Sequence, residues 1–205
     1  MDLIQDSNIV KEIVMKNVCK MLLASTVLVS GMAAAQSIEI PAIEDQSEVS
    51  ALRSLPVGVS SVENGKIYSI VSLASGKCWD VADHSLSERG QIQQWDCHGG
   101  DNQKFLATLT YKSGFILTPV ESGIRLQIAD NNLNDGARLI QAAYAAGNNG
   151  YFFVRPTSTQ GLFTINANHS SKCLDVIDHS LRNGAKIQQW ACHGQSNQTW
   201  ILIEE

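Results

Sequence analysis

One block of thirty residues occurs twice in this chain, at a fixed offset of 95 positions. The first copy, from Gly76 to Phe105, reads GKCWDVADHSLSERGQIQQWDCHGGDNQKF. The second, from Ser171 to Trp200, reads SKCLDVIDHSLRNGAKIQQWACHGQSNQTW, and 17 of the 30 positions are identical without a gap. The retained residues are largely polar or aromatic, whereas a block kept only for packing would repeat mainly its aliphatic residues. The repeat therefore predicts a functional site as well as a repeated fold.

A third and more divergent copy runs from Gly114 to Phe153, at an offset of 48 from the last copy. It retains apolar positions, because Leu126 falls on Leu174 and Phe152 falls on Trp200. It has lost the polar and cysteine positions: Gln127 replaces the aspartate, Ala142 the tryptophan, Tyr144 the second cysteine and Gly150 the glutamine. We therefore expect three units that share a core, of which two share a site.

The length agrees with three units, because Val62 to Glu205 is 144 residues, or 48 per unit. A unit of that size cannot bury its apolar face without neighbours. Short β-branched and aromatic runs between turn residues predict strands, and no helical period appears after residue 62. The strands predicted by range are Lys66–Leu73, Gly114–Thr118, Ile124–Ala129, Tyr151–Val154, Leu162–Asn166 and Trp200–Ile203. We expect an all-β domain with about four strands per unit, in units of approximately 62–109, 110–156 and 157–205, closed into a three-fold barrel.

The start of the chain, residues 1–35, has the form of a secretory signal peptide. Lysines precede an uncharged apolar run at residues 21–32, and three alanines follow before Gln36. Met15 is the more natural start of such a peptide. The run is too short for a membrane span of roughly 20 residues, so we expect export after cleavage, with an uncleaved amino-terminal anchor as the alternative. Residues 36–61 are acidic and contain two prolines, and we expect a flexible lead.

Export would place the cysteines in an oxidising compartment. Cleavage removes Cys19 and leaves two pairs, each 19 positions apart within its own copy. The middle copy has lost both members of the pair, which predicts the bridges Cys78–Cys97 and Cys173–Cys192, each stabilising the fold by about 3 kcal/mol. The alternative is zinc, for which four histidines stand near the cysteines: His84, His98, His179 and His193. Zinc needs thiols kept reduced and usually a tighter ligand spacing, so we expect no metal or cofactor.

The pattern C-x-D-V, then I-Q-x-W-x-C, then N-Q-x-[WF] resembles the ricin-type β-trefoil lectin repeat, which also serves as a carbohydrate-binding module in bacterial polysaccharide hydrolases. The resemblance covers residues 62–205 and is specific in the first and third copies. It implies a β-trefoil, a barrel capped by three hairpins, with one potential sugar pocket per unit. It also implies that Gln103 and Gln198 hold an aspartate in place, and that Phe105 and Trp200 are core residues.

The chemistry of the repeated residues also suits a sugar. A pyranose presents adjacent hydroxyls at its edge and C–H groups on one face, so a site needs fixed hydrogen-bonding groups and an aromatic plate. An aspartate can accept both hydroxyl protons, an asparagine and a glutamine can reach further hydroxyls, and a tryptophan can stack on the face. These residues are Asp80, Asn102, Gln93 and Trp95 in the first copy, and Asp175, Asn197, Gln188 and Trp190 in the third.

Each residue has a structural alternative. Tryptophan is commonly core in small β domains, aspartate commonly caps turns, and asparagine and glutamine satisfy buried backbone groups. The joint loss of aspartate, tryptophan and glutamine in the middle copy favours a site. His84 and His179 either line the rim of the pocket or shape a loop, and the loop interpretation is favoured.

Three classes of function remain. The first is a lectin for galactose-type glycans, as the resemblance implies, with a role in adhesion; the second is the cell-binding subunit of a multi-chain toxin, resembling the trefoil subunits of cytolethal distending toxins. The third is a sugar-blind structural or inhibitory trefoil. Asp80 with Asp83 offers a carboxylate pair of the kind glycosidases use, but no room for a catalytic domain remains outside the trefoil, so we expect no enzyme activity. The net charge of −5 without a basic patch argues against nucleic acid and anionic lipid.

Overall fold

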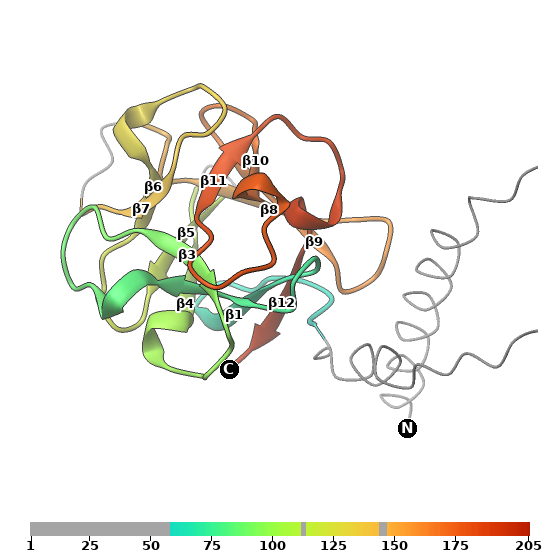
Figure 1. Cartoon of the computed structure of the whole chain (residues 1–205), viewed down its shortest axis with the longest axis horizontal. Coiled ribbons are helices and arrows are strands. Elements are labelled where there is room, and N and C mark those ends of the chain that lie inside the picture. Colours follow the sequence, from blue (N-terminus) through green and yellow to red (C-terminus); the bar gives the residue numbers. More distant parts are fainter. Residues whose placement is uncertain (1–57, 112–113, 144–146) are drawn as a thin grey trace, which may run out of the picture. The chain divides into compact units, whose positions relative to one another are not determined.

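The computed structural model describes residues 58–205 apart from 112–113 and 144–146 (Figure 1). The predicted signal peptide, nearly all of the predicted lead and Tyr144 lie outside the described residues. Within the described part of the chain, no helix is long and apolar enough to cross a membrane.

Twelve strands and five short 3-10 helices follow one another in the described residues, with four strands in each repeat. The strands are β1 (Lys66–Ser72), β2 (Cys78–Val81), β3 (Ile92–Trp95), β4 (Phe105–Leu109), β5 (Phe115–Pro119), β6 (Leu126–Ile128), β7 (Leu139–Gln141), β8 (Phe152–Pro156), β9 (Phe163–Ala167), β10 (Cys173–Val176), β11 (Ile187–Trp190) and β12 (Trp200–Glu204). The 3-10 helices are η1 (Ala82–His84), η2 (Asp101–Gln103), η3 (Ala129–Asn131), η4 (Ile177–His179) and η5 (Ser196–Gln198). The six strands predicted by range overlap β1, β5, β6, β8, β9 and β12.

Six of the strands form a closed barrel. The antiparallel neighbours run β1, β4, β5, β8 and β9, and β12 then pairs with both β9 and β1, which closes the ring (Figure 1). The other six strands form three hairpins, β2–β3, β6–β7 and β10–β11, one from each repeat. Closure leaves the barrel strands without an open edge. The predicted β-trefoil is confirmed.

The barrel core is built from equivalent residues of the three repeats. Phe105, Phe152 and Trp200 begin β4, β8 and β12, and none of the three is exposed to solvent. Trp79 packs edge-on against Phe105 and Trp200, with ring centroids 6.0 and 5.1 Å away. The aromatic residue at the end of each repeated block is therefore a core residue. The spacing of the blocks along the sequence places these aromatics at equivalent positions of the barrel.

The strand register defines which residues of the three repeats correspond. Ser72 pairs with Trp200, Pro119 with Phe105, and the last residue of β9, Ala167, lies opposite Phe152. Because the three aromatics are equivalent, their partners Ser72, Pro119 and Ala167 are equivalent as well. Each of them is the last residue of the first strand of its repeat.

Three buried glutamines, one per hairpin, connect the hairpins to one another. In β3, Gln94 donates its Nε2 to the carbonyl oxygens of Ser180 and Arg182 in the third repeat, at 2.8 and 3.0 Å. Gln141 and Gln189 bond in the same way to the loop of the preceding hairpin. The three glutamines have no solvent exposure. This ring of glutamines fixes the hairpins that carry the candidate sites.

Candidate functional site

Three candidate residues of the first repeat, Asp80, Gln93 and Trp95, lie on one face of the β2–β3 hairpin. Because side chains alternate along a strand, Val81 and Ile92 face the core together with Trp79 and Gln94. The opposite face carries the cross-strand pairs Asp80 with Gln93 and Cys78 with Trp95. The β10–β11 hairpin repeats this register, with Asp175 opposite Gln188 and Cys173 opposite Trp190.

Asp80 is a buried carboxylate held by three side-chain amides. Gln93 donates its Nε2 to Oδ1 at 3.0 Å, while Asn102 and Gln103 donate to Oδ2 at 2.8 and 3.0 Å. Asn102 and Gln103 come from η2, which lies against β2. We call Asp80, Gln93, Trp95, Asn102 and Gln103 the first site.

The third repeat contains the same arrangement, and the side chain of Asp175 is only 4% exposed. Its donors are Gln188 to Oδ1 at 3.0 Å, and Asn197 and Gln198 to Oδ2 at 2.7 and 3.1 Å. The corresponding five residues, which we call the third site, are Asp175, Gln188, Trp190, Asn197 and Gln198.

The bonds in each site leave acceptors for a hydroxylated ligand. A carboxylate offers about four lone-pair directions, and the amides occupy three of them, so one direction on Oδ1 remains. The Oδ1 atoms of Asn102 and Asn197 are also buried without a partner in the described structure. The sequence predicted that each aspartate would accept two hydroxyl protons, but the amides already use most of its capacity and leave one acceptor direction on Oδ1.

Trp95 and Trp190 are each 41% exposed, in contrast to Trp79 and Trp200, which are fully buried. A core role for Trp95 and Trp190, the alternative considered from sequence, is therefore wrong. Each indole lies beside a glycine of the neighbouring hairpin, since a Cβ at Gly184 would lie 3.9 Å from Cζ3 of Trp95 and one at Gly136 would lie 3.8 Å from Cζ3 of Trp190. An indole exposed beside a fixed acceptor can present a flat apolar face to a ligand.

The middle repeat shows what the hairpin looks like without the aspartate. Gln127 takes its place, and its Oε1 is buried without a partner. Asn149 is equivalent to Asn102 and Asn197, a correspondence that the sequence comparison missed, and it donates to the carbonyl oxygen of Ile128 at 2.7 Å. Asn102 is 3.4 Å from the corresponding carbonyl of Val81. The asparagine thus turns toward the carboxylate where one is present.

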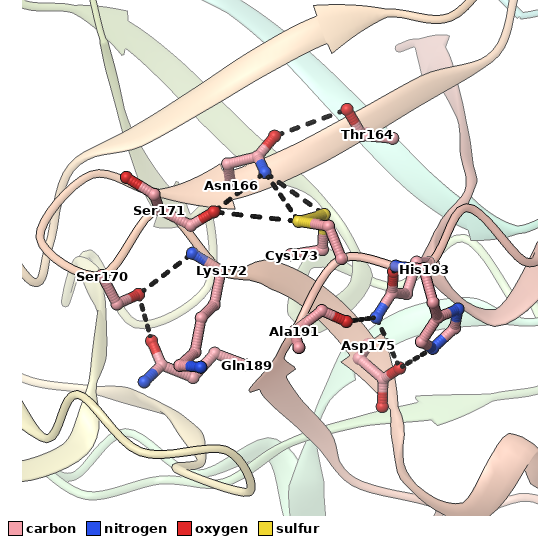
Figure 2. Close-up of a disulfide and its surroundings, with 12 residues drawn as sticks. Thr164, Asn166, Ser170, Ser171, Lys172, Cys173, Asp175, Gln189, Ala191 and His193 are labelled. Atoms are coloured by element: carbon pink, nitrogen blue, oxygen red, sulfur yellow. Dashed lines mark hydrogen bonds and ion pairs between the residues drawn. A yellow bond between two sulfur atoms is a disulfide. The ribbon is translucent and has the colours of Figure 1, made fainter.

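A histidine stands beside each aspartate. His98 Nε2 lies 3.5 Å from Asp80 Oδ2, and His193 Nε2 lies 3.5 Å from Asp175 Oδ2, as Figure 2 shows for the third site. Sequence reasoning considered these two histidines only as zinc ligands. His84 and His179 lie in η1 and η4 at positive φ, and their rings are 6.2 and 5.6 Å from those of His98 and His193. The histidines of the first repeat therefore lead from the buried aspartate to the solvent-exposed edge of the site, at His84, and those of the third repeat lead in the same way to His179. We call this edge the rim.

Both disulfides have the pairing that the repeat predicts, Cys78–Cys97 and Cys173–Cys192. Each joins the first strand of a hairpin to the segment that follows the second strand. Figure 2 shows the second disulfide on the same hairpin as Asp175 and Ala191, whose carbonyl oxygen accepts a bond from Gln198 at 3.0 Å. The bonded sulfurs are not available as zinc ligands, and no group of three or more metal-ligating side chains occurs in the described residues.

The carboxylate beside Trp95 is tied to its neighbours. Asp96 accepts bonds from Lys77 and from Asn183, the second at 2.7 Å. These hydrogen bonds, that of Lys77 first, hold the pKa of Asp96 below its usual value. In the third repeat Ala191 occupies the equivalent position, so the two sites differ in the charges around them.

Comparison with known families agrees with this geometry. Residues 57–142 and 148–205 match the model of the family described as ricin-type beta-trefoil lectin domain-like. The chain belongs to this family. The matched residues of the ricin-type domain include both sites and all three repeats.

Solved structures give the same fold. A designed three-fold symmetric protein, ThreeFoil, is 32% identical to the ricin-type domain, with a TM-score of 0.66 over 68% of this chain and 99% of that chain. An exo-β-1,3-galactanase from Clostridium thermocellum is 30% identical, with a TM-score of 0.66 over 71% of this chain and 31% of that chain. The ricin B-like lectin of Macrolepiota procera, determined in complex with lactose, is 20% identical, with a TM-score of 0.62 over 71% of this chain and 99% of that chain. This likeness shows the fold alone. Domains of this family thus occur both alone and as part of enzymes.

Proposed function

We propose that this protein is an exported, non-catalytic lectin that binds galactose-type glycans, such as those on cell surfaces, at its first and third sites. The observation that carries the proposal is the buried carboxylate beside an exposed indole, held by three amides in each site. The middle repeat keeps the fold but lacks the aspartate and the tryptophan together. Their joint loss is what a binding role predicts and a packing role does not.

In this proposal, hydrogen-bond acceptors and an aromatic ring recognise different parts of the sugar. The free acceptor direction on Asp80 would take a hydroxyl proton from the edge of the sugar, and a shift of the Asn102 side chain would bring its buried, unpartnered Oδ1 to a second hydroxyl. The face of Trp95 would pack against the C–H groups of the ring. Since three amides already hold Asp80 in place, binding requires little reorganisation of this carboxylate.

The assignment of galactose is supported by the galactanase, whose name states the polysaccharide class on which it acts, at 30% identity. Export is supported by the signal-like start of the chain and by two disulfides, which persist in oxidising compartments. The non-catalytic role is supported by the position of Asp80, which is buried and already accepts hydrogen bonds from three amides.

The proposal can be tested with a surface that carries lactose. We expect the wild-type protein to bind it and free galactose to compete. Replacing the exposed indoles by Trp95→Ala and Trp190→Ala should reduce the affinity of each site about a hundredfold or more, which silences the site at accessible sugar concentrations, because the apolar contact with the sugar face is lost. Leu133→Ala is the matched control, since it removes a 58% exposed apolar side chain from the middle repeat. Absence of galactoside binding by the wild type, or undiminished binding by the double variant, would exclude the proposal.

A further inference from the structure

The first and third sites contain the same residues, but the following repeat places a different side chain at the rim of each. The register makes Pro119 at the end of β5 equivalent to Ser72 at the end of β1. Two residues later, these strands lead to Glu121 and Ala74 respectively. The rim of the first site therefore receives a carboxylate where the rim of the third receives a methyl group.

Backbone hydrogen bonds fix these positions. The N–H of Val120 donates to the carbonyl oxygen of Lys104 at 2.9 Å, and the N–H of Glu121 donates to that of Asp101 at 3.3 Å. These bonds hold Glu121 against η2, which supplies Asn102 to the first site. At the third site, the equivalent bond runs from the N–H of Leu73 to the carbonyl oxygen of Thr199, at 3.0 Å. It holds the neighbouring Ala74 beside η5 of the third repeat.

A row of side chains connects Glu121 to the buried aspartate of the first site. Glu121 Oε1 lies 3.0 Å from Nδ1 of His84, and the ring of His84 lies 6.2 Å from that of His98. His98 in turn lies 3.5 Å from Asp80. Two histidine side chains therefore separate Glu121 from Asp80, the acceptor that would anchor a sugar. In the third site, the row ends at His179.

Two other carboxylates near the first site pair with lysines, and Asp83 of η1 has an equivalent, Asp178 of η4, in the third repeat. Asp96 pairs with Lys77, and Asp101 pairs with Lys104 at 3.1 Å. The partner of Glu121 is His84, which carries a charge only when it is protonated. Glu121 is 30% exposed in its side chain, so its charge is open to a ligand at the rim.

We propose that Glu121 determines the specificity of the first site, so that this site accepts neutral galactosides and rejects those that carry a carboxylate or sulfate group beside the anchored sugar, while the third site accepts both. The inference rests on the proposed function and adds to it the class of glycan that each site selects. Like charges at the rim repel, and this repulsion acts on a charged ligand but leaves a neutral one unaffected. One chain would then bind two classes of galactoside through two sites with the same five residue types.

Single-site proteins make the inference testable. Trp190→Ala leaves the first site intact, and Trp95→Ala leaves the third. For each we would measure by calorimetry the ratio of the affinities for lactose and for lactose 3′-sulfate. We expect this ratio to favour lactose about fivefold more in the protein with the first site than in the protein with the third.

Reciprocal substitutions supply the matched controls. In the protein with the first site, Glu121→Gln keeps the shape and hydrogen bonds of the side chain, and should raise the affinity for lactose 3′-sulfate about fivefold while the affinity for lactose stays unchanged. In the protein with the third site, Ala74→Glu should lower the affinity for the sulfated sugar alone. Both effects should shrink at high salt, because exposed charges are screened.

The outcomes separate the two claims. Lactose binding by both single-site proteins, with equal discrimination against the sulfated sugar that neither substitution alters, would overturn the role of Glu121 and leave the lectin intact. Failure of the wild type to bind lactose would overturn the proposed function and this inference with it. Unchanged lactose affinity in the substituted proteins shows that they are folded, so a changed ratio reports the charge.

Discussion

Asp80 and Asp175 are fixed by amide groups from two segments of the chain, the second strand of the hairpin and the 3-10 helix that follows it. The carboxylate serves the fold in addition to the sugar-binding role that we propose, because it accepts hydrogen bonds from three side-chain amides. A residue with both functions cannot be removed without an effect on stability.

We therefore expect Asp80→Ala to lower the free energy of unfolding by about 1–3 kcal/mol and to abolish binding at the first site, since three amide donors lose their acceptor. Chemical denaturation followed by fluorescence measures the change. Glu88→Ala, which removes an exposed carboxylate from the same repeat, should change stability by less than about 0.5 kcal/mol. Equal stability of the two variants would contradict the hydrogen-bond network described above.

At this scale, sequence alone gives much of the site. In Ile92-Gln93-Gln94-Trp95, strand alternation with Ile92 in the core already directs Gln93 and Trp95 to the other face. The number of donors to Asp80 cannot be predicted in this way, because it depends on how η2 folds against β2. The retention of Asn149 was visible in the middle repeat but has meaning only beside the neighbouring carbonyl of Ile128.

At the scale of the elements, the ring of glutamines holds the three hairpins together. Gln94, Gln141 and Gln189 occur in all three repeats, whereas the adjacent site glutamine is replaced by Ile140 in the middle repeat. For the glutamines, the one retained in every repeat is structural and the one lost from the middle repeat belongs to the site, a distinction that is visible in the sequence. It does not extend to the asparagine, which all three repeats retain as Asn102, Asn149 and Asn197.

The middle hairpin gives a direct test of the ring. Gln141→Ala should reduce the free energy of unfolding by about 1–3 kcal/mol, because the carbonyl oxygens of Ser85 and Ser87 lose a buried donor. Gln127→Leu in the same hairpin is the control, since the Oε1 of Gln127 is buried without a partner and its removal should be nearly neutral. Thermal unfolding of both variants would decide, and a larger loss for Gln127→Leu would contradict the assignment.

Contacts between repeats lie beyond what sequence reasoning reached. Glu121 is 37 residues from His84, and nothing in the motif connects the two. The link follows from the barrel register, which brings the start of each repeat beside the end of the one before it. The thirty-residue repeat therefore predicts the anchoring residues but not the residues at the rim.

At the scale of the whole molecule, a three-fold fold carries two sites. Under the proposed function, the two sites on one barrel would bind a multivalent glycan surface together, and more tightly than either site binds one sugar. The fold and the number of units were predicted from length, spacing and repeats, because a 48-residue unit must share its core with its neighbours.

The two sites should act together only on a multivalent ligand. We expect calorimetry with free lactose to give two equivalents bound by the wild type and one by Trp95→Ala or Trp190→Ala, with unchanged affinity at the remaining site. On a dense lactose surface, either single variant should lose binding by a factor on the order of 10² or more, because avidity requires both sites. A single variant that binds the surface as tightly as the wild type would contradict bivalent engagement.

The four tryptophans provide the most direct test of the central claim that the first and third sites hold a sugar against an exposed indole. In a two-dimensional ¹⁵N spectrum, each indole N–H gives its own signal, which site-directed variants can assign. Titration with lactose should shift the signals of Trp95 and Trp190 and leave those of the buried Trp79 and Trp200 in place. If the signals of Trp95 and Trp190 stay still while lactose binds, the sugar lies elsewhere and the account of both sites is wrong.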